Sequence, residues 1–80
     1  MDAAVVVRNV PTTSWNATCV ANLAVPFGPV AEVSLGPARG RAVVKFKSAD
    51  DAAEAAFNLD GAVVEGAVIR AHKWVPEREP

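Results

Sequence analysis

Four short runs of β-branched and other apolar residues predict β-strands along the chain. They lie at residues 4–10, 30–35, 41–47 and 68–72, and Pro11 closes the first run. Segments rich in Gly and Pro separate several of the runs, and such segments mark turns. Val63-Val64 and a predicted turn at Glu65-Gly66 precede the last of these strands.

Two segments between these runs predict helices. The first spans Ser14 or Trp15 to Ala24, because hydroxyl residues at 12–14 can cap a helix start and Pro26 disfavours the helical conformation at Val25. The second spans Ala49 to about Leu59 and is rich in alanine, the strongest helix former. Ser48 precedes it with a carboxylate three residues later, and Asp60-Gly61 ends it.

The predicted order is β-α-β-β-α-β. Each β-α-β half makes a right-handed crossover, so both helices are expected on one face of a four-stranded antiparallel sheet. This is the ferredoxin-like α+β sandwich, and it leaves the second sheet face open. Function is expected on that open face.

Four segments in this order resemble the RNA recognition motif family. The first strand, VVVRNV from Val5, is similar to the family's hexapeptide motif, and FGPV from Phe27 is similar to its aromatic-glycine junction. The segment RGRAVVKF from Arg39 overlies the octapeptide motif, and DDAAEAAFNLDG from Asp50 matches the alanine-rich second helix. The resemblance covers roughly residues 4–75. It implies a module that contacts RNA through its sheet.

The resemblance also implies three positions where family members carry aromatic rings that stack on bases. Here these positions hold Val6, Arg41 and Val43. Each missing ring removes about 1–3 kcal/mol of stacking per base. Any binding of nucleic acid is therefore expected to be weak.

Alternation along the strands predicts what the open face carries instead. If Val5, Val7, Ala42, Val44, Phe46, Ile69 and Ala71 face the core, the residues between them face outward. The candidate nucleic-acid contacts are Val6, Arg8, Arg39, Arg41, Val43, Lys45, Arg70, His72 and Trp74. The chain has a net charge of −1, but most of its acidic residues fall elsewhere, and Glu32 is the expected exception. Segregated basic charge favours nucleic-acid contact, although exposed strands also carry Lys and Arg for solubility alone.

Three aromatic residues have two interpretations each. Trp74 follows the last strand on the outward parity; it either stacks over the sheet or seals the edge of the core, which we favour. Trp15 and Phe57 are hard to place in the core. If both are exposed they form an apolar patch on the helical side, which is typical of a protein-binding surface; otherwise they pack in the ordinary way.

Composition limits the remaining function classes. Eighty residues allow one domain, predicted at residues 1–76, with residues 77–80 as a C-terminal tail or the end of the piece. His72 and Cys19 are the only residues of their kinds, and neither stands in a catalytic or metal-ligand pattern. No enzyme activity, cofactor or metal is expected. A single cysteine and no long apolar run favour an intracellular protein, nuclear or cytoplasmic, with no membrane contact.

Two hypotheses follow. The first is a non-enzymatic module, monomeric as an isolated domain, that binds single-stranded RNA or DNA weakly and mainly through charge. The alternative is a pseudo-RNA recognition motif that binds a protein partner through its helical face, with Trp15 and Phe57 as contacts.

Overall fold

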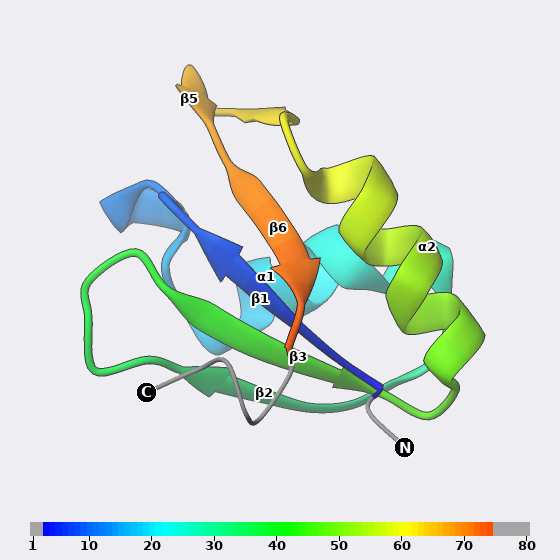
Figure 1. Cartoon of the computed structure of the whole chain (residues 1–80). Helices are drawn as coiled ribbons and strands as arrows, with labels where there is room; N and C mark the ends of the chain where they lie inside the picture. Colours follow the sequence, from blue (N-terminus) through cyan, green and yellow to red (C-terminus); the bar gives the residue numbers. More distant parts are fainter. Residues whose placement is uncertain (1–2, 75–80) are drawn as a thin grey trace.

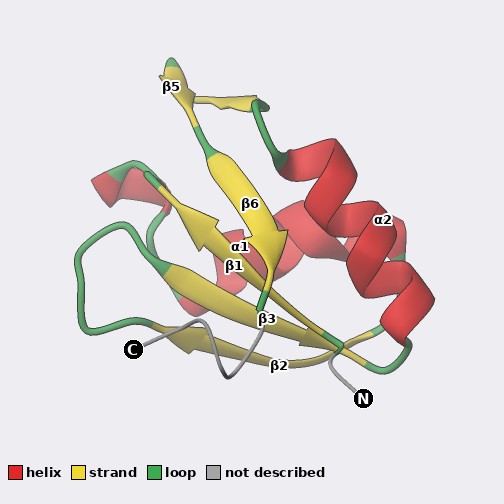
Figure 2. Ribbon diagram, viewed as in Figure 1, coloured by secondary structure: helices red, strands yellow, loops and turns green. Residues whose placement is uncertain are grey.

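A computed structural model describes residues 3–74 of the chain. It contains the predicted four-stranded antiparallel sheet, in the order β2-β3-β1-β6. The strands are β1 (Ala4–Arg8), β2 (Val30–Leu35), β3 (Ala42–Phe46) and β6 (Arg70–Lys73). Two helices, α1 (Ala17–Ala24) and α2 (Ala49–Leu59), lie on one side of this sheet, so the ferredoxin-like prediction is confirmed (Figure 1; Figure 2).

A small second sheet follows α2. It is the hairpin of β4 (Val63–Val64) and β5 (Ala67–Val68), with the predicted turn at Glu65-Gly66. The hairpin projects beyond the end of the main sheet (Figure 1). The predicted last strand at residues 68–72 is therefore divided, because Val68 pairs within the hairpin and the main-sheet strand begins at Arg70.

The core lies between the sheet and the helices. Val5, Val7, Val44, Phe46 and Ile69 are buried there, as the strand alternation predicted. Ala52, Ala55 and Ala56 lie on the face of α2 that is buried in this core. The buried members of the core are thus mostly small, which suits two short layers in a chain of this length.

The first helix begins later than predicted. Two short 3-10 turns, η1 (Thr12–Ser14) and η2 (Val25–Phe27), flank α1. The Asn16 side chain caps α1 by accepting a hydrogen bond from the Cys19 amide at 2.9 Å. The hydroxyls expected to cap the helix are engaged elsewhere: Thr13 and Ser14 both donate to Glu65 in the hairpin turn, the latter at 2.8 Å.

Gly28 has a positive φ of 150° and marks a close approach. It joins η2 to β2, and a Cβ built on it would lie 2.1 Å from a carboxylate oxygen of Asp51 in α2. A side chain at this position would displace the start of α2. The glycine of the aromatic-glycine junction is therefore required by packing.

Candidate nucleic-acid interface

The strand register forms one transverse row on the open face. Ser34 pairs with Val43, Val43 with Val6, and Val6 with His72, so all four strands contribute one residue. In the same face Arg8 on β1 stands directly opposite Arg70 on β6. Val43 is half-buried, whereas Arg8, Arg70 and His72 are exposed.

Val6 is not the accessible contact that the sequence predicted. Its side chain is 0% exposed, although it belongs to the open face by register and is absent from the core cluster between sheet and helices. β1 is a central strand, and Val43 and His72 flank Val6 on the two neighbouring strands. The sequence correctly predicted the face of the sheet to which Val6 belongs, but the side chain is buried there and not accessible.

Lys45 is exposed on the same face and has an acidic neighbour. Glu32 stands opposite it on β2, and the Lys45 Nζ lies 3.8 Å from the Glu32 Oε1. The two side chains are 54% and 59% exposed, so this ion pair contributes little to stability. The side chains of both residues are therefore accessible to solvent. Glu32 was the acidic exception expected from the sequence.

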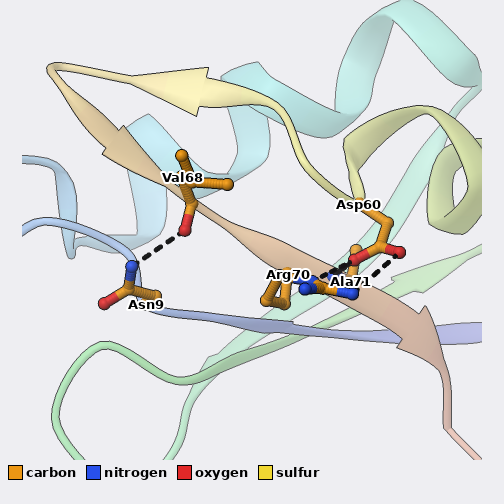
Figure 3. A network of polar contacts seen from close by, with 5 residues as sticks. All are labelled: Asn9, Asp60, Val68, Arg70 and Ala71. Atoms are coloured by element: carbon orange, nitrogen blue, oxygen red, sulfur yellow. Dashed lines mark hydrogen bonds and ion pairs between the residues drawn. The ribbon is translucent and has the colours of Figure 1, made fainter.

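Arg70 is held at the edge of the sheet by the end of α2. Its Nε donates to a carboxylate oxygen of Asp60 at 2.7 Å, and the same oxygen accepts the Ala71 amide at 3.1 Å (Figure 3). The hydrogen bond from Arg70, then that from Ala71, hold the pKa of Asp60 below its ordinary value. The same partner raises the pKa of Arg70. The Asp60 carboxylate thus accepts the Ala71 amide of the edge strand β6, and it also orients the Arg70 guanidinium.

Two of the predicted basic contacts lie in the loop before β3. Arg39 is exposed in this loop, and half-buried Arg41 precedes the first residue of the strand, which begins at Ala42 and not at Arg41. The backbone carbonyl of Arg41 accepts hydrogen bonds from the Gly36 amide at 2.7 Å and from the Trp15 indole at 3.0 Å. Arg41 therefore helps to close this loop, and its side chain is less accessible than predicted.

The burial of Trp15 and Phe57 differs from the predicted common patch. Trp15 is half-buried and packs against the core, whereas Phe57 is 84% exposed, so they do not form a common exposed patch. The amide of Trp74 donates to the Ala4 carbonyl at 2.9 Å, which extends the β1–β6 register onto the open face. Trp74 is half-buried, and both interpretations of its ring, stacking over the sheet or sealing the core edge, stay predictions.

Sequence analysis missed the contacts that join the end of β1 to the hairpin. Asn9 has a positive φ of 66°, a conformation that Asn tolerates better than most residues, and its Nδ2 donates to the Val68 carbonyl at 2.8 Å (Figure 3). With the Thr13 and Ser14 bonds to Glu65, this fixes the hairpin beside η1. The Asn of the hexapeptide segment was the available signal.

Within residues 3–74, no group of three or more His, Cys, Asp or Glu side chains is arranged to hold a metal ion. Neither helix of that part is long and apolar enough to cross a membrane.

Comparison with known proteins supports the same family. The family model for the occluded RNA-recognition motif matches residues 3–73. A search of the curated proteins found no match. Among solved structures, the Caenorhabditis elegans NONO-1 homodimer aligns with a TM-score of 0.82 and 26% identity over 91% of this chain, which spans 29% of that one.

Two further structures are similar in fold. An SXL-lethal protein–RNA complex aligns with a TM-score of 0.83 and 21% identity over 95% of this chain and 48% of that chain. The RNA15 RNA recognition motif aligns with a TM-score of 0.82 and 18% identity over 96% and 94% of the two chains. The chain is therefore comparable to the whole RNA15 domain, and to less than half of the other two proteins.

Proposed function

We propose that this chain, which belongs to the occluded RNA-recognition motif family, binds single-stranded RNA through the open face of its sheet. Domains of this family are typically binding modules without enzymatic activity. One of the structures with a similar fold is the SXL-lethal protein in complex with RNA. The binding proposed here is weak and mainly electrostatic.

The placement of Arg8 opposite Arg70 is the observation that carries this proposal. Asp60 pairs with Arg70 from the sheet edge. Both arginines are exposed on the same face as Lys45 and His72, so a phosphate backbone that crosses the strands would meet several Arg, Lys and His side chains.

The composition of the central row explains why the binding is weak. Val6 and Val43 occupy positions where a stacking ring would otherwise lie, and Val6 is buried. Two missing rings correspond to about 2–6 kcal/mol, or roughly 30-fold to 10⁴-fold in affinity. Half-buried Trp74 follows β6, and its amide hydrogen bond to Ala4 continues the pairing onto this face, so its ring is the aromatic that we expect nearest to the RNA.

A matched pair of lysines tests the proposal. Lys45 faces the open side of β3, whereas Lys73, also exposed, lies on the opposite parity of β6, beside Val5. In an NMR titration with a single-stranded RNA of about ten nucleotides, Lys45→Gln should weaken binding several-fold, because it removes a phosphate contact and leaves Glu32 without its ion-pair partner. Lys73→Gln should change binding much less.

The same titration reports where binding occurs. Amide shifts should concentrate at Arg8, Val43, Lys45, Arg70 and His72. Shifts confined to the helices, no shift at millimolar RNA, or equal effects of the two substitutions would each contradict the proposal. Titration with single-stranded DNA of the same sequence measures the preference between the two.

One observation favours a second candidate function, binding of a protein through the helical face. Phe57 projects from α2 with 84% of its surface exposed. Trp15 does not join it, because its ring packs against the core and its indole donates to the Arg41 carbonyl. Shifts limited to α2 with a protein partner, abolished by Phe57→Ser, would support this function.

A further inference from the structure

A long stretch of the chain carries no charge. Residues 9–31 contain no Asp, Glu, Lys, Arg or His, although 21% of the whole chain is charged. The stretch forms η1, α1, η2 and the start of β2. Six of the eight residues of α1 are nevertheless exposed or half-exposed, and Ala17, Thr18, Ala21 and Asn22 are among them. Depletion of charge at a surface is the compositional mark of an interface core.

The neighbouring strand has an open edge. Within residues 3–74, β2 pairs only with β3, so the backbone groups along its outer side have no strand partner there. Natural edge strands are usually protected by Lys, Pro or inward-pointing charge. β2 has a single charged residue, Glu32, which forms an ion pair with Lys45. Leu35, at the end of the strand, is 42% exposed.

A shallow groove lies between this edge and α1. Its volume is about 550 Å³, and of its nine lining residues only Glu32 is charged. Ala17, Ala21 and Ala31 keep the groove wide because their side chains are small, and Val25, 56% exposed, provides apolar surface at one end. Thr18 and Asn22 add polar groups that can hydrogen-bond a backbone.

We propose that the groove between α1 and β2 binds an extended peptide segment of a partner protein, which adds as a fifth strand to the edge of β2. Main-chain hydrogen bonds to the open edge would supply affinity, and side chains on alternate residues of the peptide would enter the groove. The lining fits apolar side chains of the size of Val. Glu32, the charged residue among those that line the groove, is paired with Lys45.

The area available favours a peptide over a second copy of this chain. Six residues of β2 span about 20 Å, and the strand with the adjacent helix is about 16 Å wide. Two flat copies would then bury roughly 650 Å² in total, below the ~1,200 Å² of a specific stable interface. A peptide strand lying in the groove can instead be covered along one edge and one face.

The probe is the blocked peptide acetyl-Lys-Val-Thr-Val-Thr-Val-Lys-amide. Titrated into the ¹⁵N-labelled chain, it should shift the amides of β2 and of α1 and slow hydrogen exchange of β2 edge amides. The control peptide has Pro in place of the central Val, which keeps the charge and removes one main-chain donor. It should bind at least several-fold more weakly.

Two Ala→Glu variants separate the groove from the rest of the surface. Ala21→Glu places a carboxylate in the groove and should weaken binding of the peptide about tenfold or more. Ala53→Glu makes the same change on the exposed face of α2, outside the groove, and should leave binding unchanged. Thr18→Glu, at an exposed groove position, repeats the test if Ala21→Glu does not fold.

Three results would overturn the proposal. The first is no shift in α1 or β2 at millimolar peptide, and the second is equal binding of the proline peptide. The third is a set of shifts in α1 and β2 that follows protein concentration without peptide and disappears in Ala21→Glu, since the occupant would then be a second copy of this chain. None of these results depends on whether the open sheet face binds RNA.

Discussion

At the scale of single residues, two phenylalanines illustrate how burial determines the loss of stability when a side chain is removed. Phe46 on β3 is 4% exposed in the core, whereas Phe57 on α2 is 84% exposed. Phe46→Ala should lower the free energy of unfolding by about 3–5 kcal/mol, since it removes apolar contacts and leaves a cavity. That loss approaches the total stability of a small domain. Urea or thermal unfolding monitored by circular dichroism measures it.

Phe57→Ala is the matched control. It should change the free energy of unfolding by less than about 0.5 kcal/mol, because an exposed ring loses little and Ala is the better helix former. A Phe46→Ala variant that unfolds at the wild-type denaturant concentration would show that β3 does not pack in this register.

Strand parity was the part of the site that the sequence could predict. Alternation alone placed Arg8, Lys45 and His72 on the open face, because each side chain's direction follows from the local pleat. It could not predict that Val6 is buried, since the burial of a side chain depends on parts of the chain that are distant in sequence. Nor did it predict the Asp60 contact with Arg70, although Asp60 was identified as the helix end.

At the scale of elements, the hairpin of β4 and β5 should respond to pH. Hydrogen bonds from Thr13, then Ser14, hold the pKa of the Glu65 carboxyl below its ordinary value. A lowered pKa in the folded state means that the stabilisation is present above the unfolded pKa and is lost as the pH falls through the folded pKa. Hydrogen-exchange protection of the Val63, Val64, Ala67 and Val68 amides should therefore fall between about pH 6 and about pH 3.

A glutamine variant isolates the contribution of this carboxyl. Glu65→Gln should lower hairpin protection at pH 6 and remove most of its dependence on pH, while Glu54→Gln on the exposed side of α2 should preserve the wild-type profile. Identical profiles for Glu65→Gln and the wild type would mean that the carboxyl does not hold the hairpin against η1.

Elements with local signals were predicted well, and elements that depend on distant partners were not. The second helix begins after Ser48 and ends at Leu59 as predicted, because both signals lie within a few residues of its ends. The start of α1 was placed too early because the hydroxyls of Thr13 and Ser14 bind Glu65, about fifty residues away, and Asn16 takes over the cap. A single sequence contains no sign of that exchange.

At the scale of the whole molecule, charge is sorted by surface although the net charge is only −1. The open sheet face and the loop before β3 carry most of the described basic residues, α2 and the hairpin turn carry most of the described acids, and the surface from η1 to the start of β2 carries none. If the two proposals hold, a nearly neutral domain would present one face to an anion and a separate face to a peptide segment.

The separation of charge predicts how strongly the affinity for RNA depends on salt concentration. A uniformly mixed surface of net charge −1 would release few counterions on meeting RNA. If instead four or five cations of the open face and the adjoining loop contact phosphates together, the log-log slope of affinity against salt should be roughly −3. Affinity should then fall about 60-fold between 50 and 200 mM salt, and Lys45→Gln should reduce the slope by less than about one unit. Measurable binding with a slope near zero would instead assign the affinity to stacking, with Trp74 as the ring that the register brings to this face.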